Sequence, residues 1–280
     1  MDSITSATAG IHARSSSAQP AIQAAGLTKR YGKNLAVDRL DLEVVRGELF
    51  GFLGPNGSGK TTTIRMMTGL LAPTDGRVSI TGIDVWSDPL AAKSRFAYVP
   101  DEPNLFPKLT AWEYLRFTAS VFGMSPDAYR QRAGELLQIF EMTDRADELI
   151  DSYSHGMRQK IALAGALLHA PEVIFLDEPT VGLDPPSART LKTLLRRVCD
   201  NGATVFLTTH ILEIAEQMCD RVAIIKAGRI IALGTIEELR QQGGGNERQS
   251  LEDLFIELTG EAQDTALIEA LTPGREHRSR

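Results

Sequence analysis

Residues 54–61 have the types and spacing of a phosphate-binding loop. They read Gly-Pro-Asn-Gly-Ser-Gly-Lys-Thr and match the pattern G-x-x-x-x-G-K-[ST]. Glycines let successive backbone N–H groups point toward a phosphate, and a helix that follows adds its positive N-terminal end. Lys60 can contact the outer phosphates, and the Thr61 hydroxyl can hold Mg²⁺. The residues predicted to contact Mg·ATP are Gly54, Pro55, Asn56, Gly57, Ser58, Gly59, Lys60, Thr61 and Thr62.

Two carboxylates and a histidine follow two other apolar runs. Asp177 and Glu178 come after residues 173–176, and His210 comes after 204–209. Because α/β proteins bind ligands beyond the carboxyl ends of parallel strands, we expect all three beside the phosphate loop. Asp177 would hold Mg²⁺ through water, Glu178 would orient or deprotonate the attacking water, and His210 would contact the γ-phosphate or that water. Taken alone, the acids would indicate a turn and the histidine a structural residue.

A parallel sheet would bring these residues together, and the pattern from residue 49 to residue 211 predicts one. Residues 49–53 are continuously apolar, as in a strand buried on both faces. The next buried strand is predicted at 173–176. A helix near 187–198, a strand at 204–207 and a helix from Ile211 follow. This alternation indicates an α/β fold with a parallel core sheet.

Other segments predict additions to that core. Apolar and acidic residues alternate over 40–44, which indicates a half-buried strand of a one-sided antiparallel sheet. Helical spacing over 110–142 is broken near Gly123, which predicts an insertion of two helices. Residues 222–225 and 230–233 predict a closing hairpin. A flexible break at 241–246 and a short amphipathic helix at 251–258 complete the pattern.

Composition limits the possible functions. The net charge of −6 and pI of about 5.5 give no overall basic field, so we expect no nucleic-acid partner. The longest apolar stretch, 161–168, is far shorter than the roughly 18 residues of a membrane span. Cys199 and Cys219 lack metal-type spacing and suit a reducing compartment, which favours the cytoplasm.

The segment 153–160, Tyr-Ser-His-Gly-Met-Arg-Gln-Lys, resembles the L-S-G-G-Q signature of ATP-binding-cassette (ABC) proteins. With the motifs above, residues 22–259 are similar to the nucleotide-binding domain of an ABC transporter. The resemblance implies a P-loop NTPase (RecA-like) core with a small antiparallel β subdomain and an inserted α-helical subdomain. It implies a leader at 1–20, an ATPase domain at 21–240 with helices at about 101–155, and a break, short helix and charged tail at 241–280.

In this family the signature of one subunit completes the ATP site of another. The resemblance therefore implies a head-to-tail dimer, with a second copy or a related subunit, in which Ser154 and Gly156 act on the other subunit's ATP. Ser154 is also a plausible helix N-cap. Tyr153, His155 and Met157 replace the signature's Leu, first Gly and Gln. The prediction of ATP hydrolysis is therefore less secure than the prediction of ATP binding.

Three further positions follow from the resemblance. Tyr31 matches an aromatic that stacks on adenine, and the alternative is a core tyrosine. Asp184 matches a loop that communicates across the dimer, and the alternative is a simple Asp-Pro turn. Asp101 stands where the family usually has a Gln that contacts Mg²⁺; a carboxylate can also bind a cation, and the alternative is a solvated turn.

The signature and residues 250–260 resemble the stand-alone ATPase subunits of bacterial multidrug and bacitracin-type exporters. The resemblance implies ATP-driven transport, with export expected and import left open, through a separate integral membrane subunit at the cytoplasmic face of the membrane. The aromatic residues Trp112, Tyr114 and Phe117 of the helical insertion could face that subunit, and the alternative is ordinary helix packing. The alternatives are a soluble ABC-type ATPase that remodels ribosomes or nucleic acid, and a regulator that binds ATP without turnover.

Overall fold

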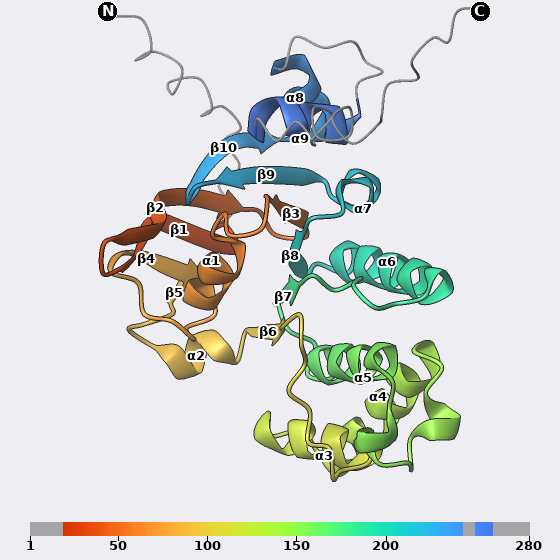
Figure 1. Cartoon of the computed structure of the whole chain (residues 1–280). Coiled ribbons are helices and arrows are strands. Elements are labelled where there is room, and N and C mark those ends of the chain that lie inside the picture. The colour runs from red at the N-terminus through yellow and green to blue at the C-terminus, as the bar shows by residue number, and fades with distance from the viewer. Residues whose placement is uncertain (1–18, 243–249, 260–280) are drawn as a thin grey trace, which may run out of the picture.

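The computed structural model of the chain describes residues 19–242 and 250–259, and Figure 1 shows their arrangement. The strands are β1 (Ile22–Tyr31), β2 (Asn34–Val44), β3 (Leu49–Leu53), β4 (Asp75–Ile80), β5 (Ile83–Asp84), β6 (Phe96–Val99), β7 (Val173–Asp177), β8 (Thr204–Thr209), β9 (Arg221–Lys226) and β10 (Arg229–Gly234). The helices are α1 (Lys60–Met67), α2 (Pro89–Lys93), α3 (Ala111–Val121), α4 (Pro126–Ile139), α5 (His155–Leu167), α6 (Pro185–Asp200), α7 (Leu212–Met218), α8 (Ile236–Gln242) and α9 (Leu251–Thr259). Two 3₁₀ turns, η1 (Thr143–Arg145) and η2 (Ile150–Ser152), lie between α4 and α5.

A six-stranded sheet in the order β10-β9-β3-β8-β7-β6 forms the core. Strands β9, β3, β8, β7 and β6 are parallel, and β10 pairs antiparallel with β9 in the predicted hairpin. Every residue of β3, β7 and β8 is buried, as predicted for strands covered on both faces. The expectation that 173–176 is the next core strand after the phosphate loop is wrong, because β6 comes first.

A second sheet, in the order β2-β1-β4-β5, is antiparallel throughout. In β2, Leu40, Leu42 and Val44 are buried while the two acids between them are exposed, which confirms the predicted one-sided strand. Apolar residues of this sheet, of the core sheet and of α1 share one buried cluster, which includes Phe50 and Ile64. The two sheets therefore hold α1, and the phosphate loop before it, between them.

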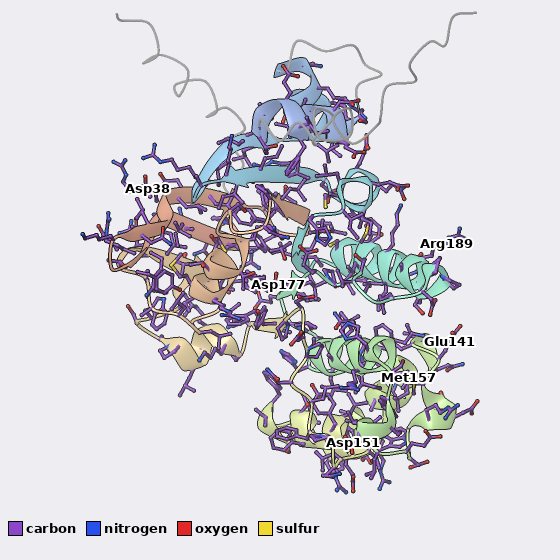
Figure 2. All side chains as sticks on the ribbon, in the orientation of Figure 1. Asp38, Glu141, Asp151, Met157, Asp177 and Arg189 are labelled. Carbon is purple, nitrogen blue, oxygen red and sulfur yellow. The ribbon has the colours of Figure 1, made fainter. Side chains whose placement is uncertain are left out.

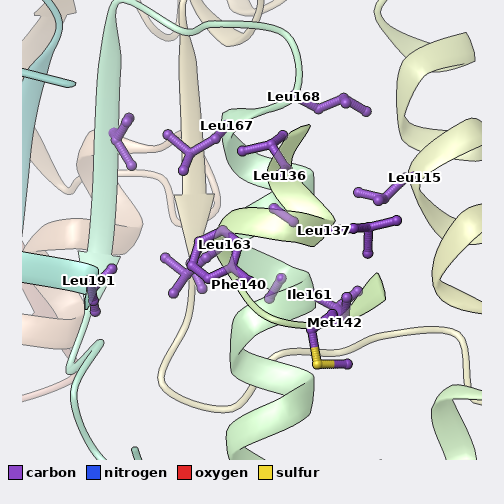
Figure 3. Close-up of a cluster of buried hydrophobic side chains, with 14 of the residues drawn as sticks. Leu115, Leu136, Leu137, Phe140, Met142, Ile161, Leu163, Leu167, Leu168 and Leu191 are labelled. Atoms are coloured by element: carbon purple, nitrogen blue, oxygen red, sulfur yellow. The ribbon is translucent and has the colours of Figure 1, made fainter. Parts of the chain in front are cut away.

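The predicted helical insertion consists of α3 and α4, separated at Gly123. Thr110 and Glu113 form a capping box at the start of α3, which satisfies two backbone donors of its first turn. Leucines and other apolar residues of α3, α4 and α5 pack into one cluster with Leu191 of α6 (Figure 3). Helix α5, which carries the signature, is thereby attached both to the insertion and to the core.

The carboxyl-terminal part packs on the β9 side of the core sheet. Leu251, Leu254 and Phe255 of α9 are buried in a cluster with β9 and α8, so the predicted amphipathic helix is confirmed. Helix α8 was not predicted, and it occupies the first two residues of the expected break. The rest of the break, residues 1–18 of the leader and the tail from 260 lie outside the described residues. Among residues 19–242 and 250–259, no helix is long and apolar enough to cross a membrane.

Candidate functional site

Three segments with predicted chemistry meet at one edge of the parallel sheet. The phosphate loop follows β3, Glu178 follows β7, and His210 follows β8. Strand β8 lies between the other two, with Leu53 opposite Thr209 and Asp177 opposite Thr208. Parallel strands present their carboxyl ends at the same edge, so pairing alone brings the three segments together. Figure 2 labels Asp177 near the middle of the molecule, at the end of β7.

The phosphate loop folds around the amine of Lys60. The Lys60 Nζ atom donates hydrogen bonds to the carbonyl oxygens of Gly54 at 2.6 Å and Pro55 at 3.2 Å. Gly59 lies just before α1 with a φ of 112°, a conformation that suits glycine. A Cβ on Gly54 would lie 2.6 Å from Ser58 Oγ, so this position also has no room for a side chain. The loop therefore has the close backbone geometry that the motif predicts.

Asp177 is a buried carboxylate held by a threonine. It is 4% exposed, and Thr208 Oγ1 donates a hydrogen bond to its Oδ1 atom at 2.5 Å. Burial raises the pKa of Asp177, and the Thr208 hydroxyl opposes that rise by stabilising the ionised form. A cation bound beside Asp177 would stabilise the ionised form of this buried carboxylate.

Glu178 and His210 contact each other directly. His210 Nδ1 lies 3.0 Å from Glu178 Oε2, and the His210 backbone N–H donates to the same oxygen at 3.3 Å. The Glu178 side chain is 13% exposed and the imidazole 54% exposed, so the histidine forms the outer member of the pair. Glu178 has a φ of 49°, in the left-handed region that is costly for a residue with a Cβ. Such a conformation is maintained only by surrounding contacts, which makes it a candidate functional feature.

The phosphate loop, Asp177 and Glu178 border one pocket of about 240 Å³, and His210 is not among its lining residues. Its lining residues are Ala36, Asn56, Gly57, Gly59, Lys60, Thr61, Thr62, Asp101, Asp177 and Glu178. Burial, and then the charge of Glu178, raise the pKa of Asp101, while His155 and His210 lower it. A site with three carboxylates can accept a polyphosphate only if cations offset the charge, which Lys60, the N-terminus of α1 and a metal ion would do.

Within the phosphate loop, Gly54, Pro55 and Ser58 do not line the pocket, and four further predicted site residues also lie outside it. Tyr31 is half exposed at the turn between β1 and β2. Ser154 caps α5, accepting a hydrogen bond from Met157 N–H at 3.3 Å, which confirms the predicted N-cap. Gly156 is the second residue of that helix, and Asp184 caps α6. Contact of these four with nucleotide therefore requires a different part of ATP or a second subunit.

Two residues of the site were missed by reasoning from the sequence. Thr208 belongs to an apolar strand, and its importance follows only from pairing opposite Asp177. Ala36 lines the pocket because β2 passes beside the phosphate loop; a Cβ on Gly59 would lie 2.7 Å from the Ala36 carbonyl oxygen. The polar residue two positions before His210 was the available signal for Thr208, whereas nothing local distinguishes Ala36.

The sequence is similar to those of known ATP-binding proteins. Residues 37–181 match the sequence profile of the family described as ABC transporter. The linearmycin resistance ATP-binding protein LnrL of Bacillus subtilis (strain 168) is 37% identical over 250 residues, covering 89% of this chain and 78% of LnrL. The Nod factor export ATP-binding protein I of Cupriavidus metallidurans is 39% identical over 218 residues, covering 78% of this chain and 72% of that protein.

Solved structures of similar fold include the ATP-binding subunit of an ABC transporter, with 35% identity and a TM-score of 0.81, covering 85% of this chain and 98% of that one. A second is the dimeric, post-hydrolysis cassette MJ0796 bound to ADP and Pi, with 28% identity and a TM-score of 0.71, covering 77% of this chain and 98% of that one. The fold class predicted from the sequence is confirmed. The chain therefore belongs to the ABC transporter family, as an ATP-binding protein that hydrolyses ATP.

Proposed function

We propose that this chain powers export through a separate integral membrane subunit, acting at the cytoplasmic face of the membrane. The observation that carries the proposal is an exposed apolar surface on α3 and on the segment that leads into it from the ATP pocket. Phe106, Phe117 and Val121 are 48%, 49% and 64% exposed, and the two phenylalanine rings meet edge to face at 5.3 Å. We call these three residues the docking surface. An aromatic patch of this kind is typical of a protein interface.

The docking surface is connected to the site through the chain. Asp101, in the pocket lining, is five residues before Phe106, and the intervening segment leads into α3. A membrane subunit bound at the docking surface would therefore touch the segment that borders bound ATP. This connection supports mechanical coupling between hydrolysis and the membrane subunit. The name of the Nod factor export protein supports export in particular.

Hydrolysis is proposed to use Glu178 as the base that orients or deprotonates the attacking water. His210 holds the Glu178 carboxylate and lies outermost, where it can meet the γ-phosphate or the water. Lys60 and the backbone N–H groups of the phosphate loop bind the β- and γ-phosphates. Since phosphoryl transfer depends mainly on positioning and charge stabilisation, these rigid contacts supply most of what the protein must contribute.

The residues present fit Mg²⁺. Thr61, Asp177 and Asp101 all line the pocket and offer oxygen atoms, which Mg²⁺ prefers. Within the part of the chain that the structure describes, no group of three or more His, Cys, Asp and Glu side chains is arranged to hold a metal ion. This suits an ion that is shared with substrate phosphates. Mg²⁺ would neutralise phosphate charge, with Thr61 and Asp177 as its main protein contacts and Asp101 as a weaker one.

A second subunit is proposed to complete the site. Ser154 and Gly156 begin α5 away from the chain's own pocket, and a helix N-terminus suits a γ-phosphate. Their proposed ligand is the ATP of the other subunit, with Asp184 beside that interface and Tyr31 stacked on the chain's own adenine. The dimeric cassette reported above supports this arrangement. The 21–240 domain, with its helical part at about 101–155, is the proposed unit of dimerisation.

Glu178→Gln tests the catalytic assignment. The variant should bind Mg·ATP, lose hydrolysis and double in mass, because the amide keeps the shape of the side chain but cannot accept the proton. Steady-state turnover and light scattering after size exclusion, with and without Mg·ATP, measure this against wild type. Wild-type turnover in the variant would refute Glu178 as the base, and a persistent monomer would refute dimerisation by this chain alone.

Substitutions in the docking surface test the membrane partner. Phe117→Ser with Val121→Ser should abolish recovery of the protein with membranes in its native host while leaving ATP turnover unchanged. Ile231→Ser, at a 39% exposed apolar residue on β10, is the matched control. Recovery with membranes is measured after nuclease treatment, which releases protein that is bound to ribosomes or DNA. Loss of recovery on nuclease treatment would favour a remodelling ATPase instead.

A further inference from the structure

The start of the signature helix packs against the turn that follows the proposed catalytic base. His155 is the first residue of α5, and its ring lies against Gly182; a Cβ on Gly182 would lie 2.8 Å from the His155 Nε2 atom. Gly156 allows the same approach from the neighbouring position, because a Cβ there would lie only 3.2 Å from the Gly182 carbonyl oxygen. Within one chain, the signature and this turn are therefore in direct contact.

The turn itself has an unusual backbone. Val181 N–H donates to the Glu178 carbonyl oxygen at 3.2 Å, and Leu183 N–H donates to the Thr180 carbonyl oxygen at 3.2 Å. Glu178 and Gly182 both have left-handed backbones, with φ of 49° and 77°. Glu178 needs outside contacts to hold this costly conformation, whereas Gly182 adopts it without strain and needs contacts only to limit its freedom to adopt others. His210 and Thr208 supply them at the Glu178 end, and His155 supplies one at the Gly182 end.

We propose that His155 is a positioning residue for Glu178: its ring braces Gly182 and so fixes the turn that aims the Glu178 carboxylate into the ATP pocket. The proposal rests on the proposed role of Glu178 as the base. The usual signature has a glycine at the position of His155, and a glycine has no side chain that could contact Gly182. The histidine in this chain therefore adds a contact that the usual signature lacks.

The proposal predicts a specific kinetic change. His155→Gly should lower kcat for ATP about 10- to 100-fold, the size of effect that a small misplacement of a reacting group produces. The KM for ATP should change less than about threefold, because the phosphate loop is untouched. His155→Phe keeps a flat ring of similar size and should retain kcat within about threefold of wild type. If both variants lose activity equally, or if His155→Gly keeps wild-type kcat, the bracing role is refuted.

A second pair of variants separates bracing from a general loss of fold. Gly182→Ala should lower kcat, because its Cβ would overlap the His155 ring and its backbone conformation disfavours alanine. The double variant His155→Gly with Gly182→Ala should be more active than Gly182→Ala alone, since the ring is removed. Additive losses would overturn direct contact between these positions. Thermal unfolding midpoints of all variants identify any that are unfolded, and activity is compared only among folded ones.

A third measurement tests whether His155 positions Glu178 in its own chain or contacts the ATP of the second subunit. In the Glu178→Gln background, adding His155→Gly should leave the ATP concentration for half-maximal dimerisation within about twofold. A large increase would mean that His155 contacts the second subunit's ATP instead, and the positioning proposal would be wrong. If Glu178→Gln alone fails to stop hydrolysis, the failure lies with the base assignment and not with His155.

Discussion

Replacing Thr208 by valine should destabilise the nucleotide-free protein through a single lost hydroxyl. Valine matches threonine in shape, and Thr208 is fully buried, so packing is nearly conserved. The change removes the 2.5 Å hydrogen bond to Asp177 and an acceptor that lies 3.2 Å from the Glu178 backbone nitrogen. The Glu178 N–H keeps the Thr208 carbonyl oxygen at 3.1 Å, so the main loss is at the carboxylate. A hydrogen bond to a charged group contributes about 1.5–3 kcal/mol, and we expect about 2 kcal/mol here.

The loss should depend on pH in a defined direction. Burial raises the folded-state pKa of Asp177 above its ordinary value of 3.8, and the hydroxyl opposes that rise, so the valine variant should have the higher folded pKa. Above both folded values the carboxylate is ionised in both proteins and the full difference in stability is present. As the pH falls through them, Asp177 becomes neutral, needs the donor less, and the difference shrinks.

Urea unfolding of wild type, Thr208→Val and Thr208→Ser, followed by circular dichroism at a series of pH values without nucleotide, measures both effects. Serine keeps the hydroxyl and should recover most of the lost hydrogen-bond energy, apart from the cost of the missing methyl group. Equal stability of the valine and wild-type proteins at neutral pH would refute the energetic role of the hydrogen bond. A loss that stays constant as the pH falls below 3.8 would refute its dependence on Asp177 ionisation.

Gly54→Ala should weaken ATP binding at least tenfold by equilibrium dialysis, because its Cβ would lie 2.6 Å from Ser58 Oγ and deform the phosphate loop. His210→Gln should lower kcat about 100-fold with ATP binding retained, which single-turnover assays would show. Asp177→Asn should raise the stability of the nucleotide-free protein by about 1 kcal/mol in urea, because a buried charge is removed, while hydrolysis is lost. Glu178→Gly should be more stable than Glu178→Ala by about 1 kcal/mol, since only alanine retains a Cβ in the left-handed conformation; the reverse order would show that the turn is unstrained.

The sequence was sufficient wherever the signal is local. The phosphate loop, its preceding buried strand and the capped start of α5 each depend on residues within about ten positions, and all three were predicted. Strand β6 was missed because four residues are too few to show a period, and its strand character depends on pairing with Phe175 and its neighbours in β7. The roles of Thr208 and Ala36 depend on strands that are distant in sequence, so only the assembled sheet reveals them.

The same long-range contacts explain why the site is energetically unfavourable before nucleotide binds. Asp177 is buried with a raised pKa, Asp101 and Glu178 add like charge, and Glu178 occupies a strained backbone conformation. Bound Mg·ATP would place cationic charge beside the three carboxylates and would add contacts around the turn at Glu178. Part of its binding free energy would therefore offset the charge repulsion and the backbone strain of the nucleotide-free site. Wild-type protein should therefore gain more stability from saturating Mg·ATP than Asp177→Asn, even though the variant is the more stable of the two without ligand. A smaller gain in the wild-type protein than in Asp177→Asn, measured as the rise in unfolding midpoint with Mg·ATP, would refute this account.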